Sequence, residues 1–311
     1  MKKILVIGSN GQLGIELLTA LRNKFGSKNV ISSDIKAPSH ADTYFEKLDA
    51  RDAISLKSIV EKQEINHVYH LAAILSANGE LNPITSWEVN MKTLLNVLEL
   101  GRKGVIERIF WPSSIAVFGR DAPKDHTDQH ALTNPSTVYG ISKLAGEKWC
   151  QYYFEKFGVD VRSIRYPGLI SHKVEPGGGT TDYAIDIFFK AISGIPYDCF
   201  LNADASLPMM YIDDAVRGTL MLMEATSQKL SIRTSYNLNA TSFSPAELIA
   251  EIKKHISGLK VQYKPDYRQL IAETWPRSID DQPARSDWGW KEAYTLAQIT
   301  AEMISALRMK K

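Results

Sequence analysis

The stretch that decides the fold is "ILVIGSNGQLG", residues 4–14. An apolar run typical of a buried strand ends at Gly8, and "QLGIELLTALRNKF" then has the apolar spacing of an amphipathic helix. Between them, Gly8, Gly11 and Gly14 allow a tight turn that brings an anionic ligand to bare backbone at the helix N-terminus. A strand, a glycine turn and a helix in this order predict the start of a nucleotide-binding α/β fold.

Apolar runs and amphipathic stretches keep alternating along the first half of the chain. We predict further strands at "NVISSDI", "YFEKLDA", "HVYHLAA", "RIFWPSS" and "VRSIRYPG". Helical spacing is found in "AISLKSIVEKQ", "WEVNMKTLLNVLELGRK" and "STVYGISKLAGEKWCQYYFEKFG". This alternation predicts a Rossmann-type, doubly wound parallel sheet built from residues 1–168. Residues 169–311 are expected to form mainly a smaller substrate-binding lobe, with some elements returning to the Rossmann core.

Composition narrows the possible partners. The 311 residues carry a net charge of +2, and their lysines and arginines are scattered, which argues against binding to nucleic acid. No apolar segment approaches the roughly 20 residues that span a bilayer, and the apolar run in "MKKILVIG" is too short for a signal peptide. Cys150 and Cys199 have neither metal-ligand nor disulfide spacing, so we expect a cytoplasmic protein without a bound metal.

Two aspartates indicate which dinucleotide binds. Asp34 ends the second predicted strand about 20 residues after the glycine turn, where a carboxylate accepts hydrogen bonds from ribose hydroxyls. The same carboxylate repels a 2′-phosphate, which favours NAD over NADP. Asp34 could instead be a turn residue in "SSDIK". Asp49 could accept from the adenine amino group, or it could be a helix N-cap.

Tyr139 and Lys143, in "YGISK", lie four residues apart on one face of a predicted helix. A phenol titrates near pH 10, too high for a base at neutral pH. A neighbouring ammonium and a positively charged nicotinamide would stabilise the phenolate and lower its pKa. Many helices carry a tyrosine and a lysine at this spacing, so the pair indicates a catalytic role only together with the surrounding motifs.

Those motifs resemble the extended short-chain dehydrogenase/reductases. The resemblance rests on the glycine turn, "LAA" (71–73), "SSIAVFG" (113–119) and the Tyr139–Lys143 pair, in family order over the first half of the chain. It implies that Ser114 hydrogen-bonds the reacting oxygen, Tyr139 accepts the proton and Lys143 binds the nicotinamide ribose. It also implies a homodimer, paired through the helices that bear Asn90 and Tyr139.

The expected cofactor site combines these motifs. Asn90 belongs to it as part of a proton relay, although a buried amide tying its helix to the backbone is equally compatible with the sequence. The predicted NAD-binding residues are Gly8, Asn10, Gly11, Gln12, Leu13, Asp34, Asp49, Leu71, Ala72, Ala73, Asn90, Tyr139, Lys143 and Tyr166.

The second half of the chain distinguishes subgroups of the family. Most extended members act on nucleotide sugars and carry a diphosphate-binding arginine ahead of "Y-V-x-D", but "LPMMYIDDA" has Leu207 at that place. "RYPGLIS" and "PGGGTTDYA" (176–184) are similar to the L-threonine 3-dehydrogenases of the family, as are "MMYIDD" and "ETWPRSIDDQPARSDWGW". This similarity implies NAD-dependent oxidation of L-threonine to L-2-amino-3-oxobutanoate.

The segment 176–182, termed here the Gly-Thr loop, suits a small zwitterion. Its glycines admit close approach to backbone N–H groups, its threonines can donate hydroxyls, and its aspartate can meet a cation or orient its neighbours. Alternatively it is a solvated loop with Thr181 as an N-cap, and Trp275 is a core residue. The predicted substrate-binding residues are Ser76, Ser113, Ser114, Tyr139, Gly178, Gly179, Thr180, Thr181, Asp182 and Trp275.

Three other activities remain to be weighed. A nucleotide-sugar 4-epimerase or dehydratase would use the same cofactor and Tyr–Lys pair, with Arg217, Arg277 or Arg285 as the diphosphate ligand. A cofactor-sensing binding protein would be expected to lack the tyrosine or lysine, and both are present. A zinc-dependent threonine dehydrogenase is disfavoured because the chain has no Cys/His cluster.

Overall fold

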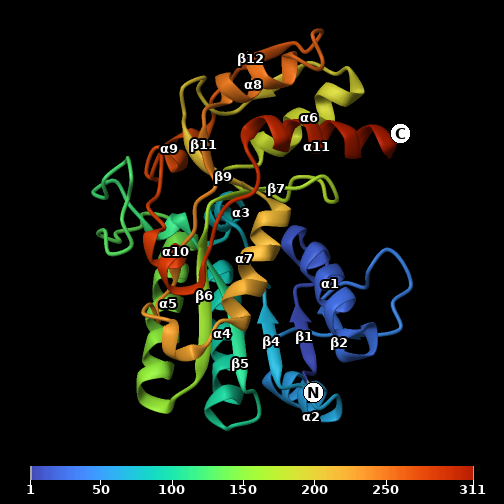
Figure 1. Ribbon diagram of the computed structural model, residues 1–311, viewed down its shortest axis with the longest axis vertical. Coiled ribbons are helices and arrows are strands. Elements are labelled where there is room, and N and C mark those ends of the chain that lie inside the picture. Colours follow the sequence, from blue (N-terminus) through green and yellow to red (C-terminus); the bar gives the residue numbers. More distant parts are fainter. Residues whose placement is uncertain (1, 311) are drawn as a thin grey trace.

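A seven-stranded parallel sheet forms the centre of the computed structural model, which describes residues 2–310 (Figure 1). The strands follow the order β10-β6-β5-β4-β1-β2-β3, and every neighbouring pair runs parallel. They are β1 (Ile4–Ile7), β2 (Val30–Asp34), β3 (Phe45–Lys47), β4 (His67–His70), β5 (Arg108–Ser114), β6 (Asp160–Tyr166) and β10 (Tyr236–Asn237). The predicted doubly wound Rossmann-type fold is confirmed.

Helices cover both faces of this sheet, which explains why its strands lack polar alternation. Along β1, Ile4 and Val6 pack into one apolar cluster with α1 and α7, and Leu5 and Ile7 into another with α2, α4 and α5. The helices of this region are α1 (Gln12–Phe25), α2 (Ala53–Lys62), α3 (Ser76–Leu81), α4 (Pro83–Arg102), α5 (Val138–Phe157) and α7 (Ile212–Glu224), with short 3₁₀ turns η1 (Ser27–Asn29), η2 (Ile115–Val117) and η3 (Ser227–Lys229).

Two small sheets and further helices lie beyond the carboxyl ends of the central strands, at the top of Figure 1. The sheets have the orders β11-β9-β7 and β12-β8. Their elements are β7 (Gly168–Ile170), α6 (Tyr183–Ser193), β8 (Tyr197–Cys199), β9 (Leu207–Tyr211), β11 (Thr241–Phe243), α8 (Pro245–Lys253), β12 (Val261–Tyr263), α9 (Tyr267–Ala272) and α11 (Leu296–Met309). The helix α10 (Gln282–Trp288) lies lower in Figure 1 and packs against β10 of the central sheet.

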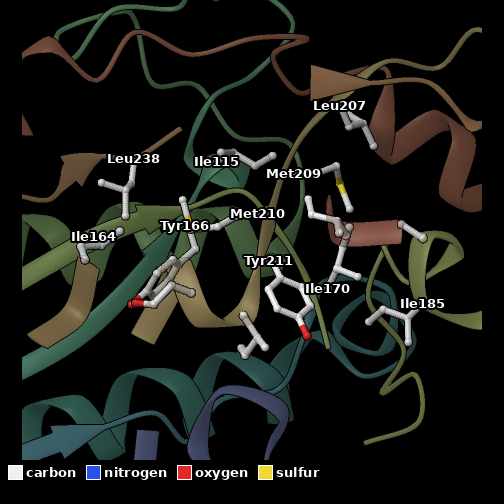
Figure 2. Packing of buried hydrophobic residues seen from close by; sticks show 14 of the residues in the cluster. Ile115, Ile164, Tyr166, Ile170, Ile185, Leu207, Met209, Met210, Tyr211 and Leu238 are labelled. Carbon is white, nitrogen blue, oxygen red and sulfur yellow. The ribbon is translucent and has the colours of Figure 1, made fainter. Parts of the chain in front are cut away.

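One apolar cluster joins this smaller part to the central sheet. Figure 2 shows Ile164 and Tyr166 of β6 in the same packed group as Met209 of β9 and Ile185 of α6. The chain also returns to the large sheet, because β10 pairs with β6 and becomes its edge strand. A division of the chain after residue 168 stays a prediction.

Several helix ends follow from local capping chemistry. Ser244 with Glu247 and Thr295 with Gln298 form the expected capping boxes of α8 and α11. The alternative that Asp49 is an N-cap is wrong, because Asp52 caps α2 instead. The short helices α3, α9 and α10 were not predicted, since six or seven residues give too little periodicity. None of the helices within residues 2–310 combines the length and apolar character needed to cross a membrane.

Candidate active site

The glycine turn between β1 and α1 is so tight that no side chain fits at Gly8 or Gly14. Gly8 has a φ of +83°, and a Cβ added there would lie 2.7 Å from the backbone nitrogen of Ala72. Gly11 is the N-cap of α1, with no side-chain cap bond and no acidic residue in the first turn. The N-terminal N–H groups and the helix dipole are thus left for an anionic ligand, and the turn fits the pyrophosphate of a dinucleotide.

Asp34 lies at the end of β2 beside this turn. Its carboxylate accepts hydrogen bonds from the backbone N–H of Asn10, at 3.1 Å, and of Lys36, at 3.3 Å. The Asn10 side chain donates to the Lys36 carbonyl at 2.8 Å. Asp34 therefore connects the glycine turn to β2, in the position that a ribose-binding acid requires.

A cavity of about 250 Å³ brings the predicted motifs together. Lysine and arginine side chains are scarce in its wall: Lys143 lines it, and among the described residues no arginine does. Of the predicted site residues, the following line the cavity: Gly8, Gly11, Gln12, Leu13, Leu71, Ala73, Ser76, Ser113, Ser114, Tyr139, Lys143, Tyr166, Gly179, Thr180, Thr181, Asp182 and Trp275.

Tyr139 and Ser114 meet where the first turn of α5 faces the end of β5. Burial raises the pKa of Tyr139 to about 12, although a hydrogen bond with Ser114 lowers it. The Lys143 ammonium nitrogen donates to the carbonyl of Pro112 at 2.6 Å and lies 5.5 Å from the centre of the Tyr139 ring. Burial lowers the pKa of Lys143 to about 7. The protein groups alone therefore keep the phenol protonated at neutral pH, and further positive charge is needed to make it a base.

The Gly-Thr loop is held by its own aspartate. One oxygen of Asp182 accepts from the N–H groups of Gly178 and Gly179, each at 2.8 Å. Burial has the largest effect on the pKa of Asp182 and raises it, although these bonds act in the opposite direction. Of the two roles foreseen for Asp182, the geometry supports orienting its neighbours. Asp182 also stands at the N-cap position of α6, so the alternative that Thr181 caps this helix is wrong.

The two threonines of the loop differ in their partners. The hydroxyl of Thr180 lies 3.0 Å from that of Ser76, which ties the loop to the first residue of α3. Thr181 lines the cavity, and its hydroxyl has no hydrogen-bond partner within the part of the chain that the structure describes. Trp275 is 5% exposed and also lines the cavity, so it is both a core residue and a wall of the site.

Comparisons with known proteins are consistent with this geometry. Residues 4–238 match the NAD dependent epimerase/dehydratase family. This chain belongs to that family. NAD is accordingly its cofactor, as the glycine turn and Asp34 predicted.

Several full-length relatives are known in the family. The chain is 44% identical to an uncharacterized epimerase/dehydratase of Staphylococcus haemolyticus, over 100% of this chain and 99% of the relative. A GalE-like L-threonine dehydrogenase from Cupriavidus necator, solved in a holo form, is 54% identical with a TM-score of 0.96 (98% and 99% covered). A monomeric L-threonine 3-dehydrogenase from a metagenome database is 50% identical with a TM-score of 0.96 (99% of each chain covered).

Some residues predicted for the family site lie outside the cavity wall. The Asn90 amide bonds both backbone groups of Ile74 and the hydroxyl of Ser142, which is the structural tie considered as an alternative. Asp49 pairs with the Arg51 side chain at 2.6 Å. Asn10, Ala72 and Gly178 are next in sequence to lining residues without lining the cavity themselves, and Asp34 lies outside the wall, bonded to Asn10. The ligand contacts of Asn90 and Asp49 stay predictions.

Sequence reasoning missed part of the apolar wall. Leu75, Pro112, Ile115, Pro167 and Leu169 all line the cavity. Each adjoins a motif residue, but an apolar side chain carries no chemical signal of its own. Their only cue in the sequence is that each stands next to a motif residue.

The arginines considered as diphosphate ligands are engaged elsewhere. Arg217 pairs with Asp214, Arg277 with Asp125 and Arg285 with Asp281. Leu207, which stands where many family members have the arginine, is 2% exposed within β9.

Proposed function

We propose that this protein oxidises the 3-hydroxyl of L-threonine with NAD and yields L-2-amino-3-oxobutanoate. One observation carries the proposal: a single small cavity is lined by the glycine turn, the Ser114–Tyr139–Lys143 group and the Gly-Thr loop. Among the described residues no arginine lines this cavity, which suits a small amino acid better than a nucleotide sugar. The L-threonine dehydrogenases from Cupriavidus necator and from the metagenome, at 54% and 50% identity, support the same substrate.

The chain's own residues would hold the alcohol and, with the added positive charge of the bound nicotinamide, accept its proton. Ser114 and Tyr139 would hydrogen-bond the substrate hydroxyl, and Tyr139 would take its proton as the carbonyl forms. The Lys143 ammonium would stabilise the phenolate, since an opposite charge nearby lowers the pKa of Tyr139. Bound NAD would supply the acceptor for the hydride that leaves the substrate's β-carbon.

The carboxyl and amino groups of the substrate would meet the Gly-Thr loop. Thr181 has a free hydroxyl at the cavity, whereas the N–H groups of Gly178 and Gly179 already donate to Asp182. A hydroxyl donor is therefore the readiest partner for the substrate carboxylate. Trp275, which lines the same cavity, would close over the bound amino acid.

The nucleotide-sugar alternative has weaker support. The nucleotide-sugar members of the family bind the sugar-nucleotide diphosphate with an arginine, and here Arg217, Arg277 and Arg285 are each held in an ion pair away from the cavity. The Leu207 side chain is buried in β9 and cannot bind an anion.

The assay that tests the proposal mixes the purified protein with NAD and, separately, L-threonine, D-threonine, L-allo-threonine, L-serine and UDP-glucose. We expect NADH to form with L-threonine and not with the other compounds, and we expect Tyr139→Phe to abolish it while still binding NAD. If no amino acid gives NADH, the products formed from UDP-glucose must be analysed, because an epimerase regenerates its NAD. Conversion of UDP-glucose without NADH formation would replace the proposal.

We also propose a homodimer in the cytoplasm. Aromatic side chains gather half-exposed on the outer face of α5, where Trp149, Tyr152 and Phe157 are 38%, 45% and 45% exposed. Such a patch is typical of a subunit interface. The metagenome relative is nevertheless described as monomeric, so light scattering of the purified chain must decide the number of subunits. Cys150 and Cys199 are unpaired and buried, which suits a reducing compartment.

A further inference from the structure

Glu147 is a buried carboxylate beside the catalytic group, one helical turn beyond Lys143 on α5 and 1% exposed. We propose that Glu147, paired with Arg165, is a positioning residue that fixes the end of β5 against α5 and so sets Ser114 beside Tyr139. This inference rests on the proposed function, because Ser114 and Tyr139 act on the substrate hydroxyl in that reaction.

The contacts of Glu147 join the helix α5 to two neighbouring strands of the sheet, β5 and β6. Its Oε1 accepts from the Ser113 hydroxyl at 2.6 Å and from Nε of Arg165 at 2.8 Å, and its Oε2 accepts from Nη2 of Arg165 at 2.8 Å. Arg165, on β6, is the register partner of Ser113 on β5 and is 5% exposed. A bidentate pair this deeply buried has a fixed geometry, because any shift would leave a charge without a partner.

Two successive turns of α5 therefore hold two successive residues of β5. The Lys143 ammonium binds the carbonyl of Pro112, and the Glu147 carboxylate binds the hydroxyl of Ser113. Ser114 is the next residue, and its side chain points to the opposite face of the strand from that of Ser113. Since the strand end is tied at both positions, the approach of Ser114 to Tyr139 is fixed as well. A misplacement of about 1 Å at such a site can reduce turnover about 100-fold.

The charge of Glu147 also acts on Lys143. The titratable groups around Lys143 are Tyr139, Glu147 and Cys150 on α5, and the buried His70 on β4. Burial lowers the pKa of Lys143, and the negative charge of the nearby Glu147 carboxylate opposes that effect. Removing the Glu147 charge would lower the pKa of Lys143 further, leave less ammonium near neutral pH and make the Tyr139 phenolate harder to form.

The test compares Glu147→Gln with Glu155→Gln, an exposed residue on the same helix. With NAD and L-threonine, we expect Glu147→Gln to lower kcat about tenfold or more, with both KM values within about threefold. We also expect the rise of kcat/KM with pH to move to higher pH. Glu155→Gln should match the unaltered protein. A merely structural role would reduce the yield of folded protein without moving the pH profile.

A second readout does not depend on the substrate. The phenolate absorbance of Tyr139 in the NAD complex, taken as a difference against Tyr139→Phe, should emerge at higher pH in Glu147→Gln. If the unaltered protein does not oxidise threonine, the proposed function fails, and this titration still decides the role of Glu147. A folded Glu147→Gln with unaltered kcat, pH profile and phenolate titration overturns the inference.

Ser113→Ala decides the matter if Glu147→Gln does not fold. This variant leaves the ion pair between Glu147 and Arg165 intact and removes one tie to β5. We expect a lower kcat, an unchanged pH profile and a threonine KM within about threefold. An unaltered kcat overturns the inference, and so does a rise in the threonine KM alone, which would make Ser113 a substrate ligand instead.

Discussion

The glycine turn at residues 8–14 and the Gly-Thr loop at residues 176–182 have similar compositions but opposite backbone chemistry. In the turn, side chains leave the N-terminal N–H groups of α1 uncapped. In the loop, Asp182 takes the N–H groups of Gly178 and Gly179. The turn is therefore suited to bind a ligand through its backbone, and the loop through its side chains.

The difference arises from where the acid lies in the chain. Asp182 is three residues from Gly179 and can fold back onto the loop that carries it. Asp34 comes from another strand and, among the described residues of the turn, bonds the N–H of Asn10, so no side chain caps the first turn of α1. The number of glycines does not distinguish a loop that binds its own acid from a turn that leaves its N–H groups open. The number of residues between the glycines and the acid does distinguish them.

Gly14→Ala should have the largest effect, because the turn has no space for a side chain. An added Cβ would lie 2.8 Å from the carbonyl carbon of Ser9 and closer still to the oxygen of Gly8. Both are backbone atoms, so the turn must open, and we expect NAD affinity to fall about 100-fold or more with loss of turnover. Calorimetric titration with NAD measures this. Gly258→Ala is the control, since nothing lies within 4 Å of its added Cβ. If Gly14→Ala binds NAD as tightly as the unaltered protein, the backbone of the glycine turn does not bind NAD closely.

Asp182→Ala should weaken the recognition of threonine by the Gly-Thr loop and leave NAD binding at the glycine turn nearly unchanged. It leaves two N–H groups without an acceptor, at a cost of about 1–3 kcal/mol each where they are buried. We expect kcat/KM for threonine to fall about 100-fold while the Kd of NAD changes less than about threefold. Steady-state kinetics and NAD titration together check this. Asp186→Ala, on the next turn of α6 and outside the cavity wall, is the matched control. Equal losses for NAD and threonine would show that the two segments do not act separately.

The sequence predicted the turn more completely than the loop, for a physical reason. Gly8, Gly11 and Gly14 lie in consecutive elements, and their geometry follows from a strand entering a helix. Thr180 and Ser76, by contrast, are 104 positions apart, and only the folded chain brings their hydroxyls to 3.0 Å. The same limit hid Leu75 and Leu169, whose place in the wall depends on tertiary packing.

Lys143 lines the cavity that both segments share, and its buried charge should make stability depend on pH. The pKa of Lys143 is about 7 in the folded protein, against 10.5 for a free lysine side chain, so between these values the unfolded chain binds the extra proton. The free energy of unfolding should therefore rise by up to about 1.4 kcal/mol per pH unit across this range. Lys143→Met has no titratable group at this position, so its free energy of unfolding should lack this rise with pH. Urea unfolding of both proteins at several pH values measures the difference between their free energies of unfolding. If this difference does not change with pH, burial does not lower the pKa of Lys143.

Thr181→Val should have the smallest effect and separates the side chains of the loop from its backbone. The substitution keeps the shape of the side chain and removes a hydroxyl that has no protein partner among residues 2–310 but lines the cavity. We expect an unchanged melting temperature and an unchanged NAD affinity, with the KM for threonine raised about tenfold by the loss of one hydrogen bond to a charged group. Thr180→Val is the contrasting variant, since it breaks the bond to Ser76 and should lower the melting temperature as well. A threonine KM unaffected by Thr181→Val would leave recognition to the loop backbone, and the two glycine segments would then work alike.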